Sequence, residues 1–425
     1  MTALVPTLRR LASLLHSSLA WVALLGTLAV PASAADNEAR QAAWARLKLD
    51  PAAMAVLRGD VVESDAVKRK QALGLLIFKD KDLSEPRGQS CADCHHFNRA
   101  FTTPGPTSPG ANPALFGPRN APSITYARFS PNLQGGGDEG FKGYFGGQFR
   151  DGRVDFLSDQ AKLPLLNPIE MANPDMQTVV DKVAAARFAG EFKAVYGDDI
   201  FTRTADAYDA IADAIATFES SKLFARFDSK YDAYLRGETT LSDAEMRGLA
   251  VFNDPKHANC ASCHISGATE VWGPRPLFTD FGYDNIGVPR NPENKFYKMP
   301  PQYNPDGWKY VDIGLYAVAP YPFNRARFKA PSLRNVAVTG PYMHNGYFKT
   351  LRGVLDFYNT RDVKPACANR FTTEADALAQ GCWPEPEFAK TMNTKDLGNL
   401  RMSEQDIDDM MAYLATLTDG WSDTQ

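Results

Sequence analysis

The chain has 425 residues, of which 46 are Lys or Arg and 50 are Asp or Glu, giving a formal net charge of -4. This mixed, weakly acidic composition excludes the basic surface that nucleic-acid binding requires. Beyond the N-terminal segment, no stretch approaches the ~18 consecutive apolar residues of a membrane-spanning helix.

The N-terminal segment is organised like a secretory signal peptide. Arg9 and Arg10 form a basic region, residues 19–30 an apolar core, and Pro-Ala-Ser-Ala at residues 31–34 a cleavage site. The apolar core is too short for a stable membrane span. We therefore expect cleavage after Ala34, removal of residues 1–34, and a mature protein in the periplasm.

A cysteine motif at residues 91–95 is the next strong signal along the chain. It reads Cys-Ala-Asp-Cys-His and returns at residues 260–264 as Cys-Ala-Ser-Cys-His. In such a motif two thiols bond to the vinyl groups of a c-type haem, and the adjacent histidine binds the iron. A zinc half-site or a redox pair would leave the histidine unexplained twice. The sequence predicts two covalently bound haem c groups, attached through Cys91, Cys94, Cys260 and Cys263, with His95 and His264 as iron ligands.

Helical patterns dominate the remaining sequence. Residues 205–223 are Ala-rich with periodic apolar positions, and the segments opening at Ser242 and Ser403 carry an acidic residue three positions on, as in a capping box. Long Pro/Gly stretches at 104–122 and 272–322 are too irregular for core helices, and loops of this length suit the wrapping of a cofactor. We predict a mainly α fold with long loops and two tandem haem domains, residues 35–205 and 206–425.

The two remaining cysteines, Cys367 and Cys382, have no histidine after them. They lie among Gly, Pro and Asn residues in a chain that carries an export signal, and exported proteins form disulfides. We predict that they form a structural disulfide closing a loop.

The histidine count limits the sixth ligands of the two irons. His96 and His257 lie too close in sequence to the two motifs to reach the opposite haem faces, so His344 is the remaining free histidine of the mature chain. At least one iron must then use Met, Tyr or no sixth ligand. This excludes an electron carrier with two histidines on both irons.

Residues 329–346, KAPSLRNVAVTGPYMHNG, resemble the signature of the bacterial di-haem cytochrome c peroxidase/MauG family. Further blocks with the family's order and spacing support the resemblance over roughly residues 65–418, and they lie at 117–122, 150–153, 166–171 and 278–281. The resemblance implies an enzyme that reacts with hydrogen peroxide at one haem and passes oxidising equivalents through the other.

Tyr358 marks the MauG-like branch of this family. It stands fourteen residues after His344, where the usual peroxidases carry the Met ligand of the second haem. Residues 351, 354, 355 and 358 have helical spacing, so Tyr358 faces inward, and by pattern alone it could be a core aromatic. The resemblance implies that Tyr358 binds the second iron.

The first haem differs from the usual peroxidases as well. Asn112 occupies the place of their distal histidine, so we expect this haem to be open to peroxide. The resemblance implies distal roles for Gln160, Pro164 and Glu170, with Glu170 as the proton shuttle. An isolated glutamate is more often a solvated surface residue, which is the alternative for Glu170.

The resemblance also implies a calcium ion between the haems. The matching ligands are the Asn120 side chain and the carbonyls of Thr339 and Pro341, a set that suits a hard cation. His344 would support this region or a haem propionate.

Two positions depart from the family pattern. Arg150 replaces the tryptophan between the haems, and Ala258 replaces a surface tryptophan of MauG. Arginine is not oxidised at accessible potentials, so Tyr144, Phe149 and Tyr342 are the aromatic alternatives for a relay.

Together these features predict a periplasmic enzyme that reduces hydrogen peroxide at the N-terminal haem and oxidises a partner protein through the second. One alternative is a peroxide-scavenging peroxidase fed by a small cytochrome c or a cupredoxin. Another is a non-enzymatic di-haem electron carrier, with Met299 or Met343 as an iron ligand.

Overall fold

The computed structural model describes residues 63–135, 143–267 and 274–422. The predicted signal peptide lies outside these residues. Helices and long loops build the described chain, and its strands form two antiparallel pairs of two residues each, β1–β2 and β3–β4. The prediction of a mainly α fold with long loops is confirmed.

The regular elements of the described residues are connected by loops and single 3-10 turns. The α-helices are α3 (Asp65–Phe78), α4 (Cys91–Cys94), α5 (Leu157–Leu166), α6 (Met176–Ala184), α7 (Ala189–Tyr196), α8 (Thr204–Glu219), α9 (Lys230–Leu235), α10 (Asp243–Asn253), α11 (Leu351–Thr360), α12 (Glu374–Gln380) and α13 (Glu404–Ala415). The strands are β1 (Gln134–Gly135), β2 (Tyr144–Phe145), β3 (Tyr283–Asp284) and β4 (Phe328–Lys329).

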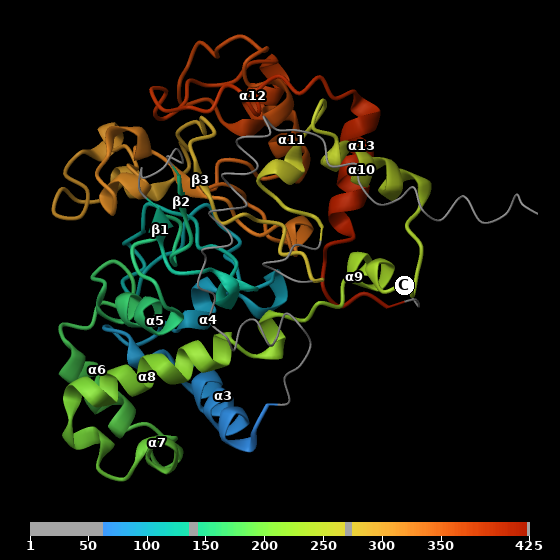
Figure 1. The fold of residues 1–425 in the computed structure, drawn as a ribbon. Coiled ribbons are helices and arrows are strands. Elements are labelled where there is room, and N and C mark those ends of the chain that lie inside the picture. The colour runs from blue at the N-terminus through green and yellow to red at the C-terminus, as the bar shows by residue number, and fades with distance from the viewer. Residues whose placement is uncertain (1–62, 136–142, 268–273, 423–425) are drawn as a thin grey trace, which may run out of the picture.

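Two helix pairs form the centres of two hydrophobic cores. In the lower part of Figure 1, α3 packs against α8, and at the right α10 packs against α13. Each pair crosses at a glycine: a Cβ on Gly74 of α3 would lie 2.1 Å from the Ala214 carbonyl oxygen, and one on Gly248 of α10 would lie 2.0 Å from that of Asp409. Glycine costs a helix about 1 kcal/mol relative to alanine. Here it lets two backbones approach closely in each half.

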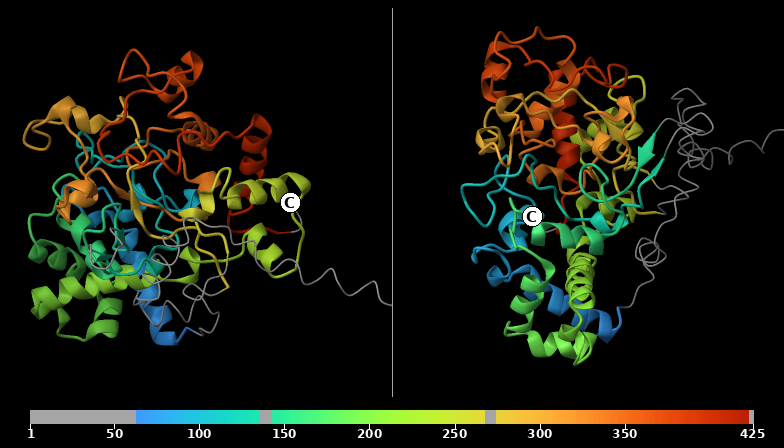
Figure 2. Two further views of the ribbon diagram at one scale, coloured as in Figure 1. Left: turned by 45° about the horizontal axis from the view of Figure 1, so that its top comes forward. Right: turned by 90° about the vertical axis from the view of Figure 1, so that its left-hand side faces the viewer.

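The cores show where the chain passes from one half to the other. The first core runs from Leu73 to Phe224 and includes most of α8, while the second runs from Tyr231 to Leu417. The domain boundary at 205/206 stays a prediction, and the packing of α8 places residues 207–224 with the first core. Both side views in Figure 2 keep the blue-to-green helices at one end of the molecule and the red helices at the other.

The predicted helix starts at Ser242 and Ser403 are both capping boxes. Ser242 caps α10 with Glu245, and Ser403 caps α13 with Asp406. Each box satisfies backbone donors that a helix start leaves unpaired. These two caps set the N-terminal starts of α10 and α13, the helix pair beside the second cysteine motif.

A buried ion pair lies where the two halves meet. The Arg334 guanidinium, in a side chain 2% exposed, donates two 2.9 Å hydrogen bonds to the Asp232 carboxylate of α9. It also lies over the rings of Phe227 and Tyr126, at 4.4 and 4.8 Å from their centroids. Arg334 and Asp232 belong to the second half and Tyr126 to the first, so the contact between the guanidinium and the Tyr126 ring crosses from one half to the other.

We expect Asp232→Asn to lower the free energy of unfolding by about 3–5 kcal/mol, because it leaves the buried guanidinium without its counter-charge. Denaturant unfolding of the holoprotein measures this change. Glu238→Gln, which breaks the exposed pair with Arg236, is the matched control and should have little effect. Equal effects of the two variants would contradict the role given to the buried pair.

Cys367 and Cys382, 15 positions apart in sequence, are joined by a disulfide that closes a loop containing α12. Closing a loop of this length stabilises a fold by about 3 kcal/mol, mainly by restricting the unfolded chain. We expect the double variant Cys367→Ser/Cys382→Ser to lose stability of this order in denaturant unfolding. An unchanged midpoint would show that neighbouring contacts already hold the loop.

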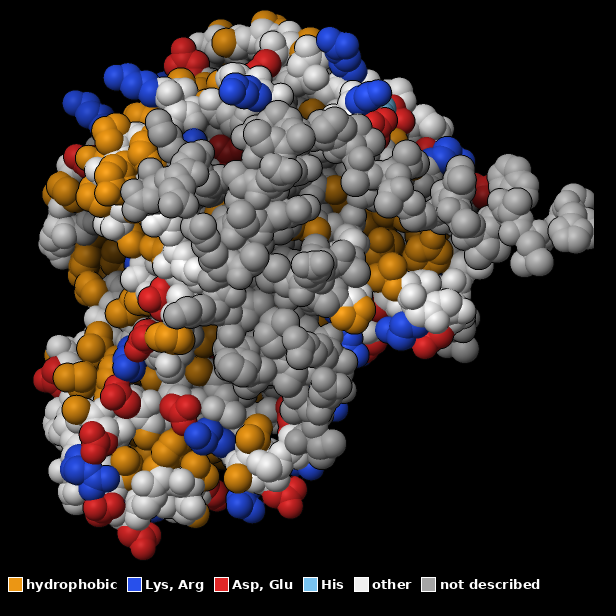
Figure 3. All heavy atoms as spheres, in the orientation of Figure 1, with side chains coloured by type: hydrophobic (Ala, Val, Ile, Leu, Met, Phe, Trp, Pro, Cys, Tyr) orange, Lys and Arg blue, Asp and Glu red, His pale blue; other side chains and the backbone are white. Residues whose placement is uncertain are grey.

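The surface agrees with the mixed composition. On the face shown in Figure 3, the described acidic and basic side chains are interspersed, with hydrophobic side chains between them. Among the described residues, no helix is long and apolar enough to cross a membrane.

Candidate active site

The first cysteine motif borders a cavity of about 340 Å³. Cys91 and Cys94 lie on α4, a single turn that Ser90 and Asp93 close with a capping box, and His95 follows directly. All three motif residues line the cavity, as do Ile215 of α8 and Leu157 of α5. Thiols and imidazole therefore face one apolar space, the arrangement that covalent haem binding requires.

The second motif borders its own cavity of about 210 Å³. Cys260, Cys263 and His264 line it together with apolar residues of α11 and α13. Its local backbone repeats that of the first motif: the His95 amide donates to the Cys91 carbonyl and the His264 amide to the Cys260 carbonyl, both at 2.9 Å. The two motifs therefore have similar local structures, one in each half of the chain.

The histidines are oriented as iron ligands. His95 Nδ1 lies 2.8 Å from the Phe101 carbonyl, and His264 Nδ1 lies 3.0 Å from the Phe278 carbonyl. A carbonyl only accepts hydrogen bonds, so Nδ1 carries the proton and Nε2 keeps a lone pair for a metal. Burial lowers the pKa of both imidazoles, which favours the neutral form that binds metal. The residues present at both sites fit a haem c.

The side chains predicted for peroxide chemistry meet in the first cavity. Gln160 and Pro164 lie on α5, Glu170 lies in the loop after it, and all three line the cavity. Burial raises the pKa of the Glu170 carboxyl, while the nearby Arg153 guanidinium opposes the shift. A carboxylate with a raised pKa is a stronger proton acceptor than an ordinary one.

No histidine other than His95 is among the described residues that line the first cavity. Asn112, at the place of the usual distal histidine, is exposed and accepts a hydrogen bond from the Ala114 amide in a turn. The space opposite His95 is therefore free of a histidine from that loop.

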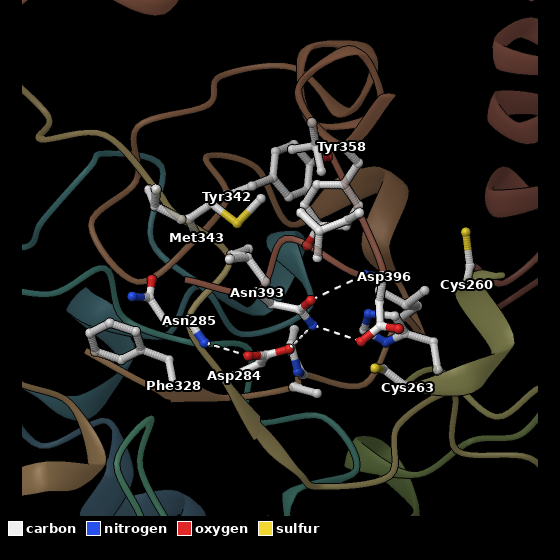
Figure 4. Close-up of a pocket in the computed structure, with 18 of the residues that line it drawn as sticks. Cys260, Cys263, Asp284, Asn285, Phe328, Tyr342, Met343, Tyr358, Asn393 and Asp396 are labelled. Carbon is white, nitrogen blue, oxygen red and sulfur yellow. Dashed lines mark hydrogen bonds between the residues drawn. The ribbon is translucent and has the colours of Figure 1, made fainter. Parts of the chain in front are cut away.

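Tyr358 lines the second cavity from α11, the helix predicted by its apolar spacing. In Figure 4, Tyr358 and Met343 lie in the upper part of the view, and Cys260 and Cys263 lie at its right. In the protein alone, burial raises the pKa of the Tyr358 phenol. A bound metal ion has the opposite effect on an oxygen ligand.

The other ligand candidates lie differently. His344 stacks on Phe328, with ring centroids 3.8 Å apart, and its Nε2 lies 3.4 Å from Glu387 Oε2. Met299 packs in a separate small cluster and lines neither cavity, whereas Met343 lines both. His344 and Met343 line the second cavity as well, and Tyr358 is the side chain with a polar group that α11 contributes to its lining.

A shared wall separates the two cavities. Eight residues line both of them: Arg150, Lys329, Ala330, Pro331, Leu333, Val336, Tyr342 and Met343. Of the three aromatic relay candidates, Tyr342 belongs to this wall, Phe149 lines the first cavity, and Tyr144 lines neither. Tyr342 donates a 2.9 Å hydrogen bond to the Val336 carbonyl, and burial raises its pKa to about 12.

Three polar features of the site have no motif in the sequence. Glu219, on the inner face of α8, lines the first cavity; its Oε2 bonds to no described residue, and burial raises its pKa to about 8. Arg119 bridges Asp151 and Asp312 at 2.6–2.7 Å and so connects the walls of both cavities.

The third feature is the carboxylate cluster at the second cavity. Asn393 donates hydrogen bonds to Asp284 and Asp396, and it lies between them in Figure 4. An acidic residue on the apolar face of α8 is a sequence signal that could have revealed Glu219. The ion pairs of Arg119 and the bond from Asn393 to Asp284 join residues too far apart in sequence to be paired by pattern.

The residues predicted to hold calcium line the first cavity, but the Asn120 side chain is engaged by Arg150. Arg150 donates to Asn120 Oδ1 at 2.9 Å and to its carbonyl oxygen at 3.0 Å. The oxygen predicted as a metal ligand therefore already accepts a hydrogen bond from a cation.

Comparisons with known proteins agree with this geometry. The family model of di-haem cytochrome c peroxidases matches residues 68–240. The methylamine utilization protein MauG of Paracoccus denitrificans is 38% identical over 358 residues, which cover 82% of this chain and 88% of MauG. The cytochrome c peroxidase Ccp of Escherichia coli is 32% identical over 68% of this chain and 52% of its own length.

Among solved structures, a tyrosine-to-methionine variant of the di-haem peroxidase BthA from Burkholderia thailandensis superposes with a TM-score of 0.69 and 34% identity. The match covers 85% of this chain and 88% of BthA. The similarity thus extends over both halves and both cysteine motifs. The chain belongs to the di-haem cytochrome c peroxidase/MauG family of oxidoreductases, whose two haem c groups its two cavities accommodate.

Proposed function

We propose that this protein is a periplasmic enzyme that reduces hydrogen peroxide in the cavity of His95 and oxidises a partner protein through the cavity of His264. The observation that carries the proposal is Tyr358, which lines the second cavity from α11. A phenolate ligand favours the oxidised form of a haem, whereas the thioether of methionine raises its potential. A second site of this kind is suited to withdrawing electrons from a partner.

Haem supplies the electron chemistry of peroxide reduction, and the protein supplies proton transfer and orientation. Reduction of one hydrogen peroxide consumes two protons and two electrons and yields two waters. Glu170 takes the proton from the peroxide oxygen nearer the haem and returns it to the departing oxygen. Gln160 orients the peroxide by hydrogen bonding, and Pro164 presents an apolar surface at the same wall.

The second candidate function is peroxide scavenging with electrons from a small redox protein. Two observations favour it: Arg150 stands in the wall between the cavities in place of an aromatic side chain, and Ala258 is 3% exposed. Arg150 cannot serve as the aromatic relay between the haems, and Ala258 does not provide the surface tryptophan of MauG. Tyr358, and a first cavity whose described lining contains no histidine other than His95, favour partner oxidation.

The deciding experiment mixes the diferric holoprotein with one equivalent of hydrogen peroxide, without an electron donor, and follows the absorbance of both haems. Partner oxidation predicts an immediate change at both haems that lasts for seconds or longer. A protein that reacts only after one haem has been reduced would be a scavenging peroxidase, and fast turnover with a small cytochrome c would support that function.

Two predictions from the sequence stand beside this proposal. Residues 1–34 are proposed as a cleaved signal peptide, which N-terminal analysis of the exported protein tests. The calcium ion is not used in the proposed chemistry, because its predicted side-chain ligand is bonded to Arg150.

A further inference from the structure

Asn120 lies where the calcium ion of the sequence prediction would bind, and all its polar groups are used within the protein. Its side chain is 2% exposed. Its amide donates to the His344 carbonyl at 2.8 Å, and Nδ2 donates to the Gly105 carbonyl at 3.1 Å. The bond from Nδ2 fixes the side-chain amide, so Oδ1 points to Arg150. Asn120 is therefore held in place without a metal.

Arg150 supplies the charge at this position. It binds both oxygens of Asn120 with two guanidinium nitrogens, a planar two-point contact that lysine cannot make. No described carboxylate forms an ion pair with it, so Asn120 provides its hydrogen-bond acceptors. A guanidinium is a cation at neutral pH, and this one lies in the wall that borders both cavities.

A calcium ion and this guanidinium are alternatives. Calcium requires oxygen ligands at 2.3–2.6 Å, and Oδ1 would have to release Arg150 to approach one. Two cations sharing this oxygen would also repel each other in a poorly solvated wall. The Thr339 and Pro341 carbonyls remain at the cavity, but the predicted set has lost its side-chain ligand.

We propose that the guanidinium of Arg150 takes the place of the calcium ion, so that a fixed side-chain cation stands between the two haem cavities of this protein. The cation cannot be lost to chelators or exchanged with the surroundings. The two haem sites then need no metal ion between them, and their properties do not depend on the calcium concentration.

The test uses the intact holoprotein, treated with EGTA, desalted, and then offered calcium. We expect less than about 0.1 calcium ion per chain by elemental analysis, where an occupied site would give about one. The absorbance spectra and midpoint potentials of both haems should be unchanged by EGTA or calcium. About one retained calcium ion per chain would overturn the proposal. So would a change in the absorbance spectrum or midpoint potential of either haem when calcium is added.

Variants at position 150 test the cause. Arg150→Ala frees Asn120 Oδ1 and removes the charge, and it should take up about one calcium ion per chain with a calcium-dependent change of a haem potential. Arg150→Lys keeps a cation and should stay free of calcium. Lys329→Gln is the matched control, because Lys329 lies in the same wall and bonds to Ser130 and Gly147 instead of Asn120.

If Arg150→Ala also binds no calcium, the guanidinium is not what excludes the ion, and the proposal fails. Haem content and far-ultraviolet circular dichroism report whether each variant folds. Should Arg150→Ala not fold, Arg150→Gln removes the charge with a longer side chain. The calcium content of the wild-type holoprotein tests the proposal without any variant.

Discussion

Replacing Glu170 with glutamine should slow the reaction of the diferric protein with hydrogen peroxide by about 10²- to 10⁴-fold, the usual contribution of a positioned proton-transfer group. Glutamine keeps the shape of the side chain but cannot accept the peroxide proton. Gln160, Pro164 and the haem-binding residues stay in place, so haem content and the resting spectrum should not change. Stopped-flow absorbance after mixing with peroxide measures the rate.

The Glu170→Gln substitution should also change how the rate of the peroxide reaction depends on pH. Glu170 must be ionised to accept a proton, and burial raises its pKa above the usual value. The wild-type rate should therefore rise with pH through this raised pKa, and the rate of Glu170→Gln should lack that rise. The exposed Glu191 of α7 provides the matched control: Glu191→Gln should react like the wild type. A Glu170→Gln protein with the wild-type rate would show that Glu170 is an ordinary carboxylate at the cavity wall.

Replacing Tyr358 with methionine should raise the midpoint potential of the second haem by on the order of 0.1 V or more, within the ~0.8 V range that axial ligands cover. The anionic phenolate oxygen stabilises the ferric state, and the neutral thioether favours the ferrous state. The variant should then lose the long-lived oxidised state after peroxide and behave as a scavenging peroxidase. Spectroelectrochemical titration resolves the second haem from the first.

Tyr347→Phe is the control for this substitution. Tyr347 is 1% exposed, donates to the Thr372 carbonyl and lines neither cavity. It should leave both potentials unchanged. If Tyr358→Met also left them unchanged, Tyr358 would be a core aromatic of α11, the alternative that its sequence pattern allowed.

The sequence predicted those parts of the site that local patterns encode. The cysteine motifs fix three residues of each haem site within one turn of chain, and helical spacing placed Tyr358 on the inner face of α11. The capping boxes at Ser242 and Ser403 were equally local. Tyr358 and Glu170 lie in the expected cavities, and their chemical roles stay predictions until the variants are measured.

Pairings over long sequence distances were not predictable. Arg119 meets Asp312 across 193 residues, and nothing in either neighbourhood specifies the partner. The replacement of tryptophan by Arg150 was visible in the sequence as a lost relay. Its bonds to Asn120 appear only when the fold brings residues 120 and 150 together, so the sequence still predicted a calcium site that this side chain fills.

The wall shared by the cavities has a consequence for how the two haems titrate. Because eight residues border both cavities, an electron placed on one side changes the electrostatic potential on the other, and low-dielectric surroundings screen this change poorly. The first electron makes the second harder to add. The two potentials measured in a titration therefore belong to the pair as macroscopic values, as do the pKa values of two interacting acids, and a substitution in the wall shifts both.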